Sequence, residues 1–238
     1  MSLVPNILSV ENLTVRFETR ADIHALSFDL GEGEALAVVG PNGSGKTTLL
    51  KALLGLIPYE GKISWSPDVK IGYVPQKIDA DRHLPLNLQN RLEAKAHILK
   101  LPRKEVSAAS KTVGLTPDIL KTPIGHLSGG QFQKALIAFA LLGDPKVILF
   151  DEPTASLDEL SEEHVYDLMH ELQDERGITA ILISHDLSVV YRYANQVLCL
   201  NKEKICFGSP EEALTPEVLS KLYMAPHKYF HHIPEHHA

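Results

Sequence analysis

The octapeptide GPNGSGKT at residues 40–47 limits the possible folds of this chain more than any other part of its sequence. It fits the pattern G-x-x-x-x-G-K-[ST], follows the apolar run EALAVVG and precedes TTLLKALLGL at residues 47–56, whose leucines recur at helical spacing. Its three glycines let backbone N–H groups turn inward around phosphate oxygens, and the helix N-terminus adds a partial positive charge. Lys46 is expected to reach the β- and γ-phosphates, and the Thr47 hydroxyl to hold Mg²⁺. The sequence therefore predicts a nucleotide-binding loop between a strand and a helix.

The composition is that of a globular protein with a full core. The chain has 238 residues, of which 44% are hydrophobic and 22% charged. Its net charge of −7 argues against nucleic-acid binding through a basic surface. No apolar stretch approaches the ~18 residues of a membrane span, and the first ten residues lack the features of a signal peptide. Two cysteines are too few for a disulfide framework, so we expect a soluble, cytoplasmic, reduced protein.

Periodicity along the chain predicts an α/β core interrupted by a helical insert. Strand-like patterns occur at residues 7–17, 25–39, 61–76, 147–150 and 179–184. The last two are separated by a helical pattern at 159–175, and the order strand, helix, strand implies a parallel sheet. Residues of approximately 82–142 are helix-like and charged, with almost no β pattern. A hairpin at 196–208 and two short helices are expected near the C-terminus.

Charged and polar residues follow the two buried strand patterns. Asp151 and Glu152 end the run VILFDE, at the carboxyl edge where ligands bind in open α/β sheets. Asp151 is expected to hold Mg²⁺ through water, and Glu152 to orient or deprotonate a hydrolytic water. His185 follows TAILIS in the same way and is placed to donate to the γ-phosphate, although a single strand-end histidine is more often structural. Ser184, His185 and Asp186 are sequence neighbours, so a hydrolase triad is excluded.

A second glycine-rich turn, LSGGQ at residues 127–131, opens another helix-like segment. The phosphate loop, LSGGQ, the Asp-Glu strand end and the strand-end histidine, in this order, resemble the ATP-binding subunit of ABC transporters over essentially the whole chain. The resemblance implies one ABC ATPase domain at 1–238, with a P-loop NTPase (RecA-like) core and an antiparallel β subdomain. It also implies an α-helical signature subdomain inserted at approximately 82–142, with ATP and Mg²⁺ as cofactors.

The same resemblance assigns roles to individual residues. Glu152, His185 and Gln76 of the YVPQ stretch are the expected catalytic group, and Thr47, Gln76 and Asp151 the expected metal ligands. Phe17 lies where the family stacks an aromatic ring on adenine, although it could equally be a core residue. The remaining residues expected to bind ATP are Gly40, Pro41, Asn42, Gly43, Ser44, Gly45, Lys46, Thr47, Thr48, Ser128, Gly129, Gly130, Gln131 and Asp158.

Family membership would also imply partners. Two copies are expected to bind head to tail, so that Ser128–Gly130 of one copy contacts the γ-phosphate held by the other. Transmembrane permease subunits are the expected membrane partners, a substrate-binding protein acts indirectly, and no nucleic acid is involved. The subunit would then lie at the cytoplasmic face of the membrane.

Two segments bear on the transported substrate. Residues 77–92, KIDADRHLPLNLQNRL, resemble the zinc and manganese uptake branch in a region that receives a short helix of the membrane subunit. Residues 225–238 form a tail with five histidines, expected to be flexible, which is either metal-related or incidentally histidine-rich. Import of zinc or manganese is the favoured function. The alternatives are an importer of another substrate and a soluble ABC ATPase such as one in iron–sulfur cluster assembly.

The two cysteines occupy the expected C-terminal hairpin. A turn centred on residues 202–203 pairs Leu200 with Ile205 and Cys199 with Cys206, making the thiols direct cross-strand neighbours. In a cytosolic protein we expect them to be reduced, half-buried thiols rather than a disulfide.

Overall fold

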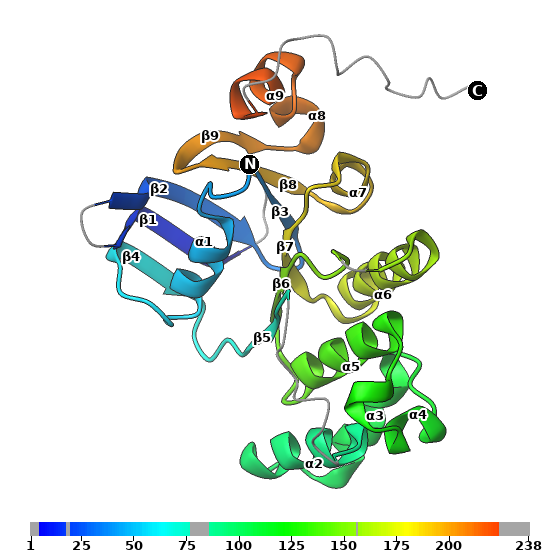
Figure 1. Ribbon diagram of the computed structural model, residues 1–238. Coiled ribbons are helices and arrows are strands. Elements are labelled where there is room, and N and C mark those ends of the chain that lie inside the picture. The colour runs from blue at the N-terminus through cyan, green and yellow to red at the C-terminus, as the bar shows by residue number, and fades with distance from the viewer. Residues whose placement is uncertain (1–4, 18–19, 77–85, 156, 224–238) are drawn as a thin grey trace. The chain divides into compact units, whose positions relative to one another are not determined.

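The computed structural model describes residues 5–17, 20–76, 86–155 and 157–223, and its elements are labelled in Figure 1. The chain divides into two compact units that are each discontinuous in sequence. The first contains Met1–Leu8, Leu30–Ala35 and Trp65–Ile183, and the second contains Ser9–Asp29, Leu36–Ser64 and Ser184–Ala238. Among the described helices, none combines the length and the apolar character that a membrane crossing requires.

Three parallel strands form the sheet of the first unit. β5 (Ile71–Val74) pairs with β6 (Val147–Asp151), which pairs with β7 (Thr179–Ile183). All residues of β6 and β7 are buried, as their uninterrupted apolar sequence predicts for parallel strands. Helix α6 (Glu159–Arg176) connects them. The strand–helix–strand unit predicted from the sequence, and with it the α/β fold class, is therefore confirmed.

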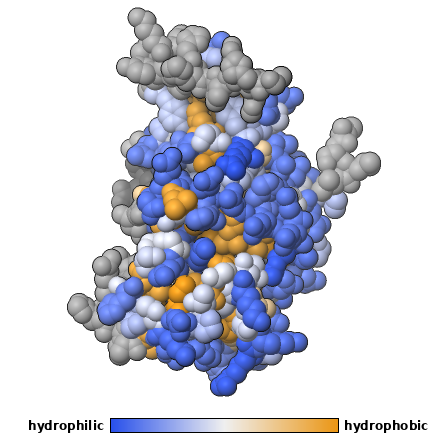
Figure 2. All heavy atoms as spheres, turned by 90° about the vertical axis from the view of Figure 1, so that its right-hand side faces the viewer, coloured by the Kyte–Doolittle hydropathy of each residue, from blue (hydrophilic) through white to orange (hydrophobic). Residues whose placement is uncertain are grey.

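The described residues between Asn87 and Leu142 are mainly helical. They form α2 (Leu88–Ile98), α3 (Arg103–Thr112), α4 (Pro117–Lys121), a 3₁₀ turn η1 (Ile124–His126) and α5 (Gly129–Leu141). α5 packs against α2, α3, α6 and strand β5. It approaches β5 so closely that a Cβ on Gly72 would lie 2.9 Å from the Ala140 carbonyl oxygen. In Figure 2, which is turned about the vertical axis of Figure 1, apolar side chains are exposed on the surface at the same vertical level as these helices.

The second unit places a parallel strand pair beside a hairpin. β3 (Ala35–Val39) pairs in parallel with β8 (Gln196–Asn201), which pairs antiparallel with the edge strand β9 (Glu203–Gly208). β2 (Arg20–Gly31), β1 (Asn6–Phe17) and β4 (Glu60–Trp65) form a separate three-stranded sheet in this order. α1 (Lys46–Leu53) follows β3, and α7 is Leu187–Tyr193. α8 (Pro210–Ala213) and α9 (Pro216–Tyr223) pack on the hairpin (Figure 1).

The helix after the phosphate loop is shorter than predicted. Its leucine spacing indicates a helix to residue 56, but α1 ends at Leu53. Gly55 adopts a left-handed conformation with φ of 67°. The amide of Leu56 donates to the Lys51 carbonyl, and the amide of Gly55 donates to the Ala52 carbonyl. This is a Schellman ending, in which Gly55 stops the helix. The strand expected at 25–39 is likewise two strands, because the chain turns at Gly33 with φ of 77°.

The C-terminal hairpin corrects two predictions. Cys199 and Cys206 are cross-strand partners as predicted, but Leu200 pairs with Lys204 instead of Ile205 because a β-bulge shifts the register. The thiols are also not reduced: the two sulfurs are joined in a disulfide. Their Cα atoms are 4.8 Å apart, within the range that a disulfide spans. The prediction of reduced thiols, which was based only on a cytosolic location, is therefore wrong. The histidine-rich tail lies outside the described residues.

Candidate nucleotide-binding site

The loop between β3 and α1 depends on a glycine at its last position. Gly45 precedes α1 with φ of 102°, a left-handed conformation that side chains disfavour. A Cβ on this residue would lie 2.8 Å from the carbonyl oxygen of Asp22, so the close approach of β2 excludes any larger residue. The Gly45 carbonyl accepts the amide of Leu49 at 2.8 Å and starts the helix. The loop is therefore held in shape before any ligand binds.

The polar groups of this loop suit a phosphate. Lys46 is only 5% exposed, and its ammonium donates to the carbonyl oxygens of Gly40 at 2.9 Å and Pro41 at 3.0 Å. Ser44 is buried, and within the described part of the chain its hydroxyl oxygen has no hydrogen-bond partner. A buried ammonium and an unpartnered hydroxyl beside a helix N-terminus are the groups that a phosphate oxygen can use. The Thr48 hydroxyl already donates to Asp22 at 2.7 Å, which ties the first turn of α1 to β2.

Four side chains of the first unit meet where β5 and β6 end. The Tyr73 hydroxyl donates to the carboxylate of Asp151 at 3.2 Å, and the amide nitrogen of Gln76 donates to Glu152 at 2.6 Å. Asp151 is 3% exposed. Glu152 has a φ of 47°, a conformation that is rare for a side chain other than glycine and that concentrates at functional sites. The parallel pairing of β5 with β6 therefore brings the predicted residue Gln76 to Glu152, next to Asp151, although 76 positions separate Gln76 and Glu152 in sequence.

The donor atoms of this group fit Mg²⁺. Carboxylate and amide oxygens are hard ligands of the kind that Mg²⁺ prefers, and Asp151 and Gln76 offer both. Burial, the charge of Asp151 and their hydrogen bond, in that order, raise the pKa of Tyr73 to about 12. Tyr73 therefore stays protonated at neutral pH, and its hydroxyl donates a hydrogen bond to the carboxylate of Asp151.

The signature turn is organised by helix capping. The Ser128 hydroxyl accepts the amide of Gln131 at 3.3 Å, and the Gln131 side chain accepts the amide of Ser128 at 3.0 Å, which together form a capping box. A Cβ on Gly130 would lie 3.3 Å from the hydroxyl of Ser161. Ser161 in turn donates through its hydroxyl and its amide to Asp158, and these bonds lower the pKa of that carboxyl. The structure thus brings Gly130 and Asp158 to the same neighbourhood.

The turn that follows β7 contains another of the predicted residues. His185 is exposed and lies between β7 and α7. The hydroxyl of its neighbour Ser184 accepts the amide of Asp186 at 3.1 Å, while Asp186 accepts the amide of Ser188 at the start of α7. Ser184 is thus part of a capped turn. The side chain of Phe17 lies outside the described residues.

Sequence reasoning missed several groups that support this site. Tyr73 lies in the same YVPQ stretch as Gln76, but its hydroxyl contact with Asp151 depends on the pairing of β5 with β6, which no sequence pattern shows. Thr154 is buried, and its hydroxyl donates to Glu162 at 2.7 Å and shares a hydrogen bond with Tyr166 at 2.9 Å. These bonds tie the segment after Glu152 to α6, and nothing in the sequence pattern indicated them.

Comparison with known proteins agrees with this geometry. The family described as ABC transporter matches residues 23–155. A protein of Cereibacter sphaeroides named "Zinc import ATP-binding protein ZnuC" is 40% identical over 209 residues, covering 86% of this chain and 83% of its own. A Thermotoga maritima protein named "Probable metal transport system ATP-binding protein" is 37% identical over 220 residues, covering 91% and 90%.

Solved structures show the same fold. A structure described as "An inward-facing conformation of a putative metal-chelate type ABC transporter" aligns with a TM-score of 0.84 and 32% identity, covering 93% of this chain and 90% of that one. An ATP-binding cassette in a dimeric, post-hydrolysis state bound to ADP and Pi aligns with a TM-score of 0.71 and 26% identity, covering 85% and 98%.

The raised pKa of Tyr73 predicts a pH dependence of stability. An unfolded tyrosine ionises near pH 10, whereas folded Tyr73 holds its proton to about pH 12. The folded state then binds more protons between these values, so the contribution of Tyr73 is complete below pH 10 and is lost as the pH rises through 12. Urea unfolding across this range should show a steeper loss of stability for the wild type than for Tyr73→Phe. Tyr59→Phe, at an exposed tyrosine, should behave as the wild type, and equal slopes for all three proteins would contradict the prediction.

Proposed function

This chain belongs to the ABC transporter family, and we propose that it hydrolyses ATP to power the import of a divalent metal ion, zinc or manganese, through a membrane permease. The observation that carries the hydrolytic part is the group at the end of β6. There a buried Asp151 accepts a hydrogen bond from Tyr73, the Glu152 carboxylate accepts one from Gln76, and the Glu152 backbone has a φ of 47°. This arrangement offers a metal-binding carboxylate and, one residue later, an oriented base.

The choice of a metal ion as substrate rests on relatives. Two relatives at 37–40% identity are named for zinc import and metal transport, and the structural neighbour with 32% identity is of the metal-chelate type. The DRHLPL stretch within residues 77–92 and the histidine-rich tail are consistent with this branch. Both segments fall largely outside the described residues.

Each site residue has a chemical task in this proposal. The loop at 40–47 binds the phosphates of ATP through its backbone amides and Lys46, and Thr47, Gln76 and Asp151 hold Mg²⁺. When bound, Mg²⁺ neutralises charge on the phosphates. Glu152 takes the proton of the attacking water, and its hydrogen bond from Gln76 orients the carboxylate. His185 donates to the γ-phosphate, and Phe17 stacks on adenine.

Hydrolysis is proposed to require a second copy of the chain. The solved cassette with 26% identity is dimeric and holds ADP and Pi, which supports a dimer. In this arrangement Ser128, Gly129, Gly130 and Gln131 contact the ATP bound by the partner copy, and Asp158 lies at the interface. The capping box keeps the amides at the start of α5 in a fixed orientation, so that they can bind phosphate without rearrangement.

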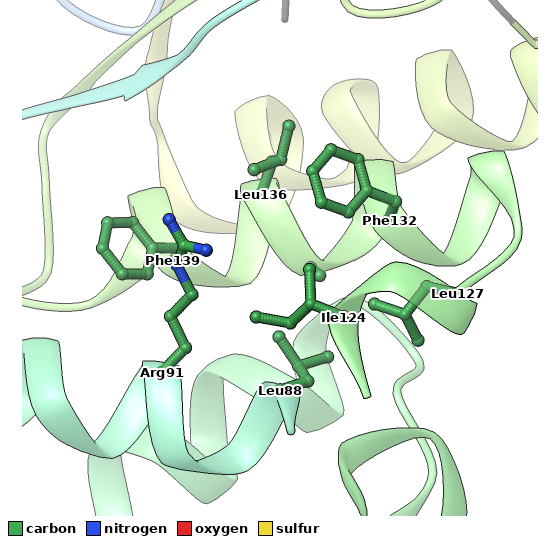
Figure 3. A pocket seen from close by; sticks show the side chains of 8 residues that line it. Leu88, Arg91, Ile124, Leu127, Phe132, Leu136 and Phe139 are labelled. Carbon is green, nitrogen blue, oxygen red and sulfur yellow. The ribbon is translucent and has the colours of Figure 1, made fainter. Parts of the chain in front are cut away.

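The permease is proposed to bind beside α2 and α5, at the cytoplasmic face of the membrane. An open, mainly apolar pocket occurs there, seen in Figure 3. Among the described residues, its lining is Leu88, Arg91, Ile124, Leu127, Phe132, Ala135, Leu136 and Phe139, of which Arg91 is charged. Leu88 and Arg91 belong to the segment 77–92 that the family resemblance assigns to membrane docking. A short cytoplasmic helix with apolar and acidic side chains fits this lining.

Replacing the proposed base separates binding from hydrolysis. Glu152→Gln keeps a side chain that can accept the Gln76 hydrogen bond but cannot take a proton at neutral pH. We expect ATP binding to remain and ATP turnover to fall by about 10²–10⁴-fold. Glu175→Gln, at an exposed position of α6, is the matched control and should hydrolyse at the wild-type rate. Near-normal turnover by Glu152→Gln would remove Glu152 from this role.

The role of Ser128 can be separated from its helix cap. Ser128→Ala and Asn87→Ala each remove a side-chain N-cap, of α5 and α2 respectively, and each should cost about 1 kcal/mol in urea unfolding. Only Ser128→Ala should weaken ATP-dependent dimerisation, measured by sedimentation in the Glu152→Gln background. Equal dimerisation by both variants would show that Ser128 has a capping role alone.

The docking surface predicts uncoupling without loss of hydrolysis. Leu86 is 43% exposed and Leu99 is 44% exposed, at opposite ends of the α2 segment. Leu86→Glu should reduce co-purification with the co-expressed permease and abolish metal uptake in vesicles, while the isolated subunit hydrolyses ATP normally. Leu99→Glu should change neither. A wild-type chain that associates with no membrane subunit would favour the alternative of a soluble ABC ATPase, such as one in iron–sulfur cluster assembly.

A further inference from the structure

The Cys199–Cys206 disulfide lies in a hairpin that contacts the phosphate loop directly. Cys199 is the β8 partner of Val39, the residue that precedes the loop. At the tip of the hairpin, the amide of Lys202 donates to the carbonyl of Ser44 at 2.9 Å, and the carbonyl of Lys202 accepts the amide of His24 at 2.7 Å. The tip is thus hydrogen-bonded to the loop on one side and to β2 on the other.

The hairpin also limits the space of the loop. A Cβ on Gly40 would overlap the carbonyl oxygen of Leu200, so β8 and the first loop residue are in closest backbone contact. The phosphate would be bound largely by the backbone amides of residues 40–47, whose positions depend on such contacts. A change in the position of residues 200–202 is therefore transmitted to the loop without an intervening side chain.

The disulfide restrains the hairpin beside an interruption in its ladder. Among the described strands, β9 lies at the edge of the sheet and pairs with β8 alone. The ladder is interrupted directly after Cys199, where the bulge shifts the register between Cys199 and Leu200. Because a bulge disrupts local pairing, the cross-link beside it limits movement of the strands at this point. Breaking it leaves the strands beside the bulge paired through a disrupted ladder, while the tip keeps its hydrogen bonds to Ser44 and His24.

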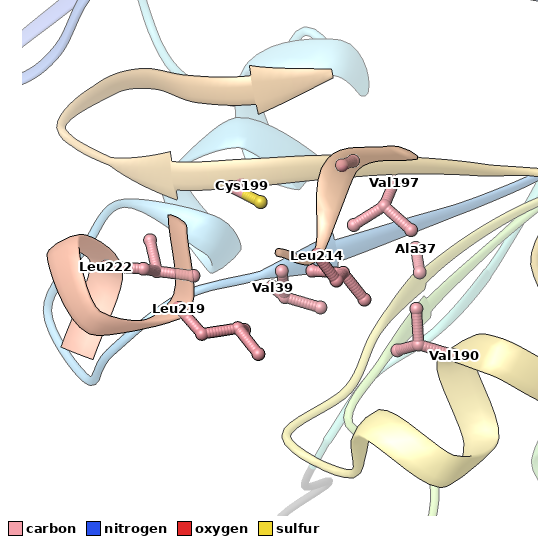
Figure 4. Close-up of a cluster of buried hydrophobic side chains, with 9 residues drawn as sticks. Ala37, Val39, Val190, Val197, Cys199, Leu214, Leu219 and Leu222 are labelled. Atoms are coloured by element: carbon pink, nitrogen blue, oxygen red, sulfur yellow. The ribbon is translucent and has the colours of Figure 1, made fainter. Parts of the chain in front are cut away.

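Thiol reagents can reach one of the two sulfurs more readily. Cys199 is fully buried in a cluster with Val39, Leu219 and Leu222, drawn in Figure 4, whereas Cys206 is partly exposed. A thiolate of a small thiol such as glutathione can attack the sulfur of Cys206, and Cys199 leaves as a thiolate that takes up a proton. A second thiolate then attacks the sulfur of the bound thiol in this mixed disulfide. It forms the oxidised small disulfide and releases the Cys206 thiolate, so two electrons pass to the protein.

We propose that Cys199 and Cys206 form a reversible thiol–disulfide site whose oxidised state increases the affinity of the adjacent loop for ATP. The inference rests on the proposed nucleotide binding but not on metal transport or hydrolysis. Oxidation preorganises the hairpin tip against Ser44, and reduction allows conformations in which the loop amides no longer converge. At the weak end of the usual range, coupling between two sites changes a binding affinity by about 5-fold, so we expect reduction to lower the affinity for ATP by about this factor.

The first experiment compares redox states of the full chain. The wild type is equilibrated in glutathione buffers of different thiol-to-disulfide ratio, its thiols are counted by alkylation and mass spectrometry, and the affinity for Mg²⁺ with a non-hydrolysable ATP analogue is measured. We expect about 5-fold tighter binding in the disulfide form. Cys206→Ser should bind like the reduced wild type at every ratio. Residue 206 is partly exposed. Comparison with the reduced wild type, which has a thiol at this position, controls for any effect of the serine on folding.

The second measurement uses the reciprocity of coupled equilibria. If oxidation tightens analogue binding by a given factor, saturating analogue must shift the dithiol–disulfide equilibrium toward the disulfide by the same factor. A disulfide that acts only on folding would raise the urea midpoint without either shift, and would overturn the inference. It would also be overturned by equal affinities in the two states, or by cysteines that remain thiols at every ratio. Absence of analogue binding in both states would instead overturn nucleotide binding itself, and the redox inference with it.

Discussion

Close backbone packing around the phosphate loop is the constraint on which the proposed chemistry depends. β2 approaches Gly45, and β8 approaches Gly40, to distances at which no Cβ fits. The loop conformation is therefore set by neighbouring main chain rather than by side chains that could change rotamer. A preformed loop lets binding energy go into contacts with phosphate instead of ordering the backbone, since ordering costs about 1–2 kcal/mol per residue.

Hydrogen bonds from uncharged donors orient the acidic residues at the end of β6. Tyr73 donates to Asp151 at 3.2 Å, and Gln76 donates to Glu152 at 2.6 Å. A phenol or an amide donor is uncharged, so neither of these two hydrogen bonds neutralises the negative charge that a cation such as Mg²⁺ can bind. The strained conformation of Glu152 is compensated by the surrounding order, including the bonds of Thr154 to α6.

The two helix starts that carry Ser128 and Asp158 share one design. Each side chain caps its own helix, and Ser161 lies between Gly130 and Asp158. Residues with a proposed contact to a partner's nucleotide are thus also structural caps of their own chain. A substitution at either position changes local stability and contact geometry together, which is why a matched cap elsewhere is needed to separate the two effects.

The sequence by itself determined the loop, the parallel strand–helix–strand unit and the family, because these depend on local residue patterns: glycine spacing, apolar runs and motif order. The sequence also predicts that Cys199 and Cys206 are cross-strand partners, but the observed turn is centred on Lys202 and the bulge restores this pairing. Only the tertiary structure decided the bulge at Leu200, the disulfide, the early end of α1 and the contacts of Tyr73 and Thr154. The contact of Tyr73 joins segments that are remote in sequence, the end of α1 depends on one residue in a left-handed conformation, and the bulge and the disulfide depend on the exact pairing of two neighbouring strands. Hydrophobic periodicity encodes none of these.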